Sequence, residues 1–196
     1  DSGECAVAGV CARLLDATRL DLARADLEGI EIHLSVASSD DAPAFADAFP
    51  EFKVTVQPPG DLGVRLAAAF AEAFRDGVDC AVVIATDVPG LEARFILAAF
   101  AVLERAPGVI GPCPDGGYYL LGLRAPGADL FQPVDWGTDR VLAQTERLAA
   151  AAGIRLEHLP PLLDVDNGND LAAWGRTLGR KAGGAAARGA GEGANG

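Results

Sequence analysis

The sequence predicts an α/β fold with a mostly parallel sheet that helices cover on both faces. Strand-like apolar segments alternate with helical patterns along the chain, as in folds built from strand–helix–strand units. One strand, at 80–87, is a continuous apolar run of the kind that is buried on both faces. With 196 residues, of which 50% are hydrophobic, the chain is long enough for one such domain.

Each element is justified by its local pattern. Short β-branched or apolar runs predict strands at 30–37, 52–56, 80–87, 108–112, 118–123 and 154–159. Apolar residues at helical spacing predict helices over 11–27, 62–77, 91–106, 138–153 and 169–179. Asp61 and Thr138 stand where N-caps of two of these helices are expected.

Composition excludes several classes of function. The formal net charge of −12 repels nucleic-acid backbones and anionic lipid surfaces, so we expect neither nucleic-acid binding nor membrane binding. No apolar stretch approaches the length that crosses a bilayer, and the start of the sequence lacks the pattern of a secretory signal. The oligomeric state cannot be predicted from these features.

Four cysteines, at spacings that fit no zinc pattern, favour reduced thiols over a disulfide framework: Cys5, Cys11, Cys80 and Cys113. This usage suggests a cytoplasmic protein.

We expect a single domain over residues 1–180, and a disordered tail over 181–196, where the chain is rich in glycine and alanine and has no large apolar side chain.

Carboxylates follow three of the predicted strands. Asp87 ends one of them, and Asp115 follows the strand at 108–112. Asp164 and Asp166 come after the last strand. Because ligands of open parallel sheets bind at the carboxyl ends of the strands, these acids are expected to converge there. Carboxylate oxygens suit Mg²⁺ or Mn²⁺, together with substrate phosphates.

Structural alternatives exist for these acids. Asp87 could cap the helix over 91–106, and Asp166 or Asn167 could cap the helix after it. Two histidines lie in or near the end of a strand, where structural roles are favoured: His33 and His158.

Five motifs in order carry a resemblance to a known family: "GDLGVRLAAAF", "ATDVPGL", "GPCPDGGYYLLGLR", "WGTDRVLAQT" and "LPPLLDVDNGNDL". Over residues 12–175 the chain resembles the radical-SAM/selenodomain-associated transferase 1 family. That family belongs to the nucleotide-diphospho-sugar transferases of GT-A fold, whose relatives include 2-phospho-L-lactate and molybdenum cofactor guanylyltransferases. The resemblance implies a three-layer α/β/α Rossmann-like fold. It also implies a glycosyl- or nucleotidyltransferase that uses a nucleotide or sugar nucleotide and a small-molecule acceptor.

The resemblance implies roles for the acids. Asp87, together with Asp164 and Asp166, matches the family's metal-binding acids, although Ala85 and Val88 replace a glycine and a cysteine of the family motif. These three acids are therefore the expected ligands of Mg²⁺ or Mn²⁺, and Asp87 is also expected to be catalytic.

The stretch "DGGYY" matches a second motif of the family, in which Pro114 replaces an acid. We expect Asp115 to be catalytic by holding a hydroxyl of the acceptor or the sugar. Gly116 and Gly117 would let a ligand approach the backbone, and Tyr118 would contact the acceptor. The alternative is a bare β-turn with two packed aromatic rings.

One family element is absent from the sequence. Family members have a first strand followed by a basic, glycine-rich loop that binds phosphate, but residues 1–12 contain no lysine or arginine. We expect the first strand to be shortened or missing, either by deletion of the loop or by truncation. Arg65 is then the best basic candidate for phosphate or base. The enzyme is expected to be impaired, or the chain is a non-catalytic small-molecule or partner-binding domain.

Overall fold

The computed structural model describes residues 30–85, 88 and 91–162. Its strands are β1 (His33–Val36), β2 (Lys53–Val56), β3 (Ala81–Ile84), β4 (Gly108–Pro112), β5 (Tyr118–Leu123) and β6 (Leu156–His158). Its helices are α2 (Ala42–Ala48), α3 (Leu62–Arg75), α4 (Ala93–Leu103) and α5 (Val141–Ala151), with a 3₁₀ turn η1 (Ala128–Leu130). The expected helices over 11–27 and 169–179, the first strand and the tail over 181–196 lie outside the described residues.

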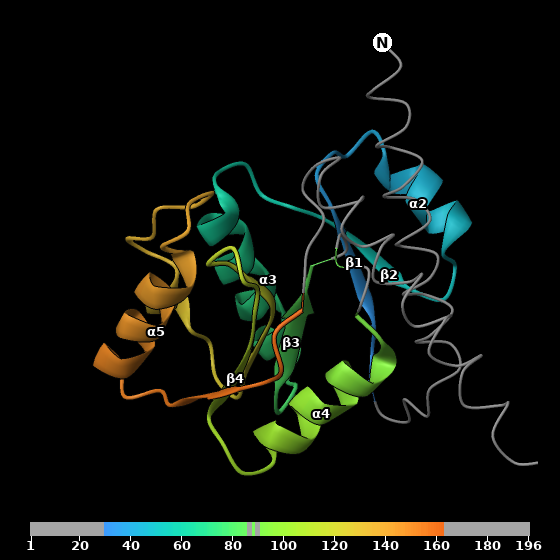
Figure 1. Ribbon diagram of the computed structural model, residues 1–196. Coiled ribbons are helices and arrows are strands. Elements are labelled where there is room, and N and C mark those ends of the chain that lie inside the picture. Colours follow the sequence, from blue (N-terminus) through green and yellow to red (C-terminus); the bar gives the residue numbers. More distant parts are fainter. Residues whose placement is uncertain (1–29, 86–87, 89–90, 163–196) are drawn as a thin grey trace, which may run out of the picture.

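The larger sheet has four strands in the order β3-β5-β4-β6. β5 is antiparallel to both of its neighbours, whereas β4 and β6 are parallel. Three strands, β3, β4 and β6, therefore run in one direction, and their carboxyl ends share one edge. β1 and β2 form a separate parallel pair within the described residues. Figure 1 shows this pair beside α2 at one side of the molecule and α5 at the other.

Two apolar clusters lie on opposite faces of the larger sheet. One contains Tyr119 and Val109 with residues of α4. The other contains Ile110 and Leu121 with residues of α3, α5 and η1. Alternate residues of β4 thus point to different helices, as the two-residue period of a strand requires. This arrangement confirms the mixed α/β fold with helices on both faces of the sheet.

Several boundaries agree with the sequence. Asp61 is the N-cap of α3, where its side chain accepts a hydrogen bond from Val64 N at 2.9 Å, and Gly77 ends this helix with φ +89°. The expected cap at Thr138 is wrong in position, because α5 begins at Val141 with Arg140 as its N-cap.

Two further features differ from expectation. α2 was not predicted. It is one short helix whose residues all remain at least partly exposed, so no apolar stripe marks it. β3, expected to be buried on both faces, is only partly buried, because it lies at the edge of the described four-stranded sheet. No described helix combines the length and the apolar character that crossing a membrane requires.

Candidate active site

A tight hairpin between β4 and β5 places Asp115 at the carboxyl end of β4. Cys113 N donates to Gly117 O at 3.0 Å, and Gly116 N donates to Cys113 O at 3.2 Å. Gly117 N also donates to Asp115 Oδ1 at 3.0 Å. The Asp115 residue is exposed, so its carboxylate is held by its own turn while remaining open to a ligand.

Gly116 is required by the packing of the protein itself. Its φ is +93°, and a Cβ there would collide with the carbonyl oxygen of Asp139 and lie 2.6 Å from the carbonyl carbon. Leu142 N donates to Gly116 O at 2.8 Å. A backbone segment just before α5 therefore occupies the space that we had expected a ligand to use. Substrate binding by Gly116 and Gly117 stays a prediction.

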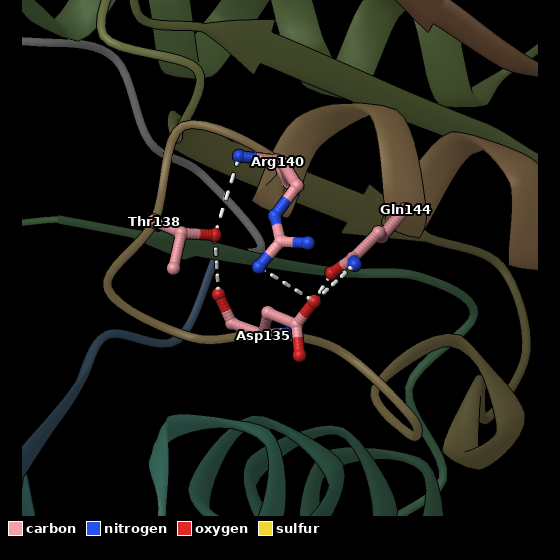
Figure 2. Close-up of polar contacts among 4 residues, drawn as sticks. All are labelled: Asp135, Thr138, Arg140 and Gln144. Atoms are coloured by element: carbon pink, nitrogen blue, oxygen red, sulfur yellow. Dashed lines mark hydrogen bonds and ion pairs between the residues drawn. The ribbon is translucent and has the colours of Figure 1, made fainter.

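A polar network holds the loop that packs on this hairpin, here called the 131–140 loop. Figure 2 shows Thr138, Arg140 and Gln144 gathered around Asp135. Two hydrogen bonds join Gln144 to Asp135. Gln144 Oε1 accepts from Asp135 N at 2.7 Å, and Gln144 Nε2 donates to Asp135 Oδ2 at 2.7 Å. Arg140 Nη2 lies 3.2 Å from Asp135 Oδ2, and Thr138 Oγ1 donates to Asp135 O at 2.7 Å. The loop is thus tied to the first turn of α5.

The two tyrosines behave differently. Tyr119 is buried, and its hydroxyl donates to Pro160 O at 2.9 Å. The Tyr118 hydroxyl is also buried but has no hydrogen-bond partner. Burial raises the pKa of Tyr118 to about 12, and the neighbouring Thr145 hydroxyl lowers it to a smaller extent without a hydrogen bond of standard geometry. A role for Tyr118 at the acceptor stays a prediction, and its hydroxyl points into the protein rather than to the open edge.

This contrast gives a matched pair of substitutions. Tyr119→Phe removes a made hydrogen bond and leaves Pro160 O without its donor, so we expect the free energy of unfolding to fall by about 1 kcal/mol. Tyr118→Phe removes a hydroxyl that has no partner, so we expect no loss. Urea denaturation of both variants measures the difference. An equal loss in the two variants would show that Tyr118 has a partner in solution.

The described segments that precede the two groups of predicted metal acids in the sequence both contact the hairpin strands. Asp87, Asp164 and Asp166 themselves lie outside the described residues. Ala85, just after β3, donates its N–H to Tyr119 O at 2.9 Å, and Leu162 N donates to Pro112 O at 3.2 Å. Pro112 and Tyr118 are paired across the hairpin. The segments that precede these acids in the sequence therefore reach the same end of the sheet as Asp115.

Other predicted residues have simpler surroundings. Among the described residues, no three His, Cys, Asp or Glu side chains are close enough to hold a metal ion. His33 is paired with Glu31 at 2.8 Å, and His158 is paired with Glu146 at 2.6 Å. The N-cap position of α4 is Glu92, whose side chain makes no capping hydrogen bond. The alternative in which Asp87 caps this helix stays a prediction, because Asp87 lies outside the described residues.

Arg65 lies in the first turns of α3 and is partly buried. Its Nη1 donates to Gln57 Oε1 at 3.2 Å, and its Nε is buried without a partner. Sequence reasoning missed Gln57, and nothing in its local pattern marks it. It also missed two other side chains with buried, unpartnered polar atoms, Trp136 and Thr145.

Comparison with known proteins gives a family and a fold. A family model described as an uncharacterized protein conserved in bacteria (DUF2064) matches residues 20–138. None of the curated protein sequences matches the chain. A protein from Desulfovibrio desulfuricans G20, provisionally assigned as a nucleotide-diphospho-sugar transferase, has a solved structure with a TM-score of 0.74 and 31% identity. The match covers 85% of this chain and 74% of that chain.

Two more distant structures share the fold. The 4-diphosphocytidyl-2C-methyl-D-erythritol synthase of Anaerococcus prevotii DSM 20548 has a TM-score of 0.61 at 10% identity, over 84% of this chain and 85% of that chain. The mannosyltransferase PcManGT of Pyrobaculum calidifontis, solved with GDP-Man and Mn²⁺, has a TM-score of 0.54 at 16% identity, over 83% and 56%. These matches confirm the Rossmann-like fold of nucleotide-diphospho-sugar transferases.

Proposed function

The chain belongs to the DUF2064 family, and on this premise we propose that it is a metal-dependent GT-A-type transferase acting on a nucleotide-activated donor. Both glycosyl transfer and nucleotidyl transfer occur among proteins of this fold, as the names of the similar structures state. Within the DUF2064 family, the narrower proposal is a radical-SAM/selenodomain-associated transferase, on the five motifs quoted above.

One observation supports this proposal most directly. Ala85 and Leu162, which precede the two groups of proposed acids in the sequence, are both hydrogen-bonded to the strands at the hairpin that carries Asp115. The described chain just before each group of proposed acids therefore ends at one edge of the sheet. Carboxylate donors of this kind fit a hard divalent cation.

The proposed roles follow from this arrangement. Asp87, Asp164 and Asp166 would hold Mg²⁺ or Mn²⁺, which when bound would neutralise the charge on the donor phosphates. Asp115 is exposed and is fixed through Oδ1, so its carboxylate would accept a hydrogen bond from an acceptor hydroxyl and orient it. Arg65 would contact the donor or the acceptor from α3.

Ligand binding tests the proposal. We expect a nucleoside triphosphate or a sugar nucleotide, such as GDP-Man, to stabilise the protein only when Mn²⁺ is present. A ligand at 100 times its Kd stabilises the native state by about 2.7 kcal/mol, which corresponds to a rise in Tm of roughly 5–10 °C for a domain of this size.

A thermal-shift panel with and without Mn²⁺ measures the effect, and Mn²⁺ alone is the control. A preference for the triphosphate would identify nucleotidyl transfer, and a preference for the sugar nucleotide would identify glycosyl transfer. No metal-dependent shift with any nucleotide would overturn the proposal.

A further inference from the structure

Arg65 differs from every other described basic residue. The remaining described lysines and arginines are exposed, whereas Arg65 is partly buried. Several of the exposed side chains are paired with acids, as in Lys53 with Asp76 and Arg94 with Glu92. Among the described residues Arg65 has no acidic partner, and the acid nearest to it in the helix, Asp61, uses its Oδ1 to cap Val64 N. A neutral partner alone only partly compensates the free-energy cost of removing a cation from water.

Gln57 fixes the orientation of this cation. Its backbone N–H donates to Val36 O at 2.8 Å, so the residue is anchored at the ends of β1 and β2. Its side-chain Nε2 donates to Ser35 O at 3.1 Å. A carbonyl oxygen only accepts hydrogen bonds, so the amide must turn its Nε2 toward Ser35 and its Oε1 toward Arg65. The hydrogen-bond network thus assigns this amide in one orientation.

This orientation leaves one edge of the guanidinium unused. Gln57 Oε1 accepts a hydrogen bond from Arg65 Nη1 at 3.2 Å. In the described part of the chain, neither Nε nor Nη2 makes a hydrogen bond, and Nε is buried. The N–H bonds of Nε and Nη2 point in the same direction and match the two oxygens of a phosphate or a carboxylate.

We propose that Gln57 is a positioning residue that aims the Nε–Nη2 edge of Arg65 at an oxyanion of the substrate. The inference rests on the proposed function only for the identity of that substrate. The oxyanion is a phosphate of the donor, or a phosphate or carboxylate of the acceptor, because both offer the same pair of oxygens.

The test measures Kd by calorimetry on the full chain with three probes. Inorganic pyrophosphate, with and without Mn²⁺, represents the donor, whereas glycerol 3-phosphate and D-glycerate represent phosphate-bearing and carboxylate-bearing acceptors. Arg65→Lys keeps the charge but loses the paired N–H groups, so we expect about tenfold weaker binding of the probe that the site accepts. Arg75→Lys, an exposed arginine on the same helix, is the matched control and should leave Kd unchanged.

Gln57→Leu is expected to weaken binding about fivefold through the loss of orientation. In the double variant the two effects should not add, because Gln57 acts only through Arg65. A purely structural Gln57 would lower the Tm and leave Kd unchanged. Circular dichroism and the Tm of each variant separate misfolding from loss of binding.

The outcomes separate this inference from the proposed function. Arg65-dependent binding of any probe supports the inference, even if no nucleotide binds with Mn²⁺. Metal-dependent nucleotide binding that Arg65→Lys leaves unchanged would overturn the inference while the proposed function stands. The inference also fails if no probe binds, or if the losses from Arg65→Lys and Gln57→Leu add in full.

Discussion

Gly116→Ala is expected to lower the free energy of unfolding by about 3 kcal/mol, from overpacking and from strain at positive φ together. The added Cβ would collide with the carbonyl oxygen of Asp139, and at φ +93° an alanine is strained even without that contact. The neighbouring segment cannot easily retreat. Leu142 N is bonded to Gly116 O, and the 131–140 loop is tied to α5 through Asp135 and Gln144.

Gly117→Ala is the matched control in the same turn. A Cβ at Gly117 would lie 3.4 Å from Asp115 Oδ1, an ordinary contact, and its φ is not positive. We therefore expect a change within about 1 kcal/mol. Urea denaturation of the two variants gives the comparison. Similar losses would mean that the close approach of Asp139 to Gly116 is not present in solution.

These two glycines show where sequence reasoning stops. The pattern "DGGYY" predicts that a ligand approaches the backbone at this turn, whereas at Gly116 the structure has the backbone of Asp139. It could not show that the neighbour is Asp139, 23 residues later, because that contact depends on how the 131–140 loop folds back. The positive φ of Gly116 and its contact with a distant backbone segment are each sufficient reasons for a glycine at this position, and neither involves a ligand.

The fold itself was largely predictable because each long element has its own local signal. Residues 62–77 carry a helical apolar stripe, an acidic cap and a terminal glycine, and the structure has α3 over Leu62–Arg75. The strand at 108–112 has the predicted bounds. α2 gave no such signal, since seven residues make about two turns and bury no side chain.

Side-chain partners were less predictable than elements. Arg65 was singled out as the best basic candidate, but its partner Gln57 belongs to the end of another strand, and only the folded arrangement brings the two together. The surroundings of the Tyr118 hydroxyl, which is buried without a hydrogen-bond partner, likewise include Thr145 of α5, 27 residues away in the sequence. Hydrogen bonds between side chains of different elements leave no periodic pattern in the sequence, so the sequence does not predict them.

Asp87→Ala is expected to reduce metal-dependent turnover by at least about 100-fold, because a carboxylate that holds the metal supports the charge that develops on the donor phosphates. The same change should alter the free energy of unfolding by less than about 0.5 kcal/mol, as for surface substitutions without a special role. The N-cap position of α4 is Glu92, so Asp87→Ala leaves the N-cap residue of this helix unchanged. Removing one acid from a group of acids also relieves repulsion in the absence of metal.

Asp79→Ala provides the matched control, because Asp79 is an exposed acid that precedes β3, at the opposite end of the strand from Asp87. It should leave both Mn²⁺-dependent turnover and Mn²⁺-dependent nucleotide binding unchanged. The decisive comparison is a metal titration of wild type and the two variants with the nucleotide that the thermal-shift panel identifies. If Asp87→Ala retains the wild-type response to Mn²⁺, Asp87 is not a metal ligand and the proposed site must lie elsewhere. If it loses both stability and activity, Asp87 has a structural role in addition to the proposed metal-binding one.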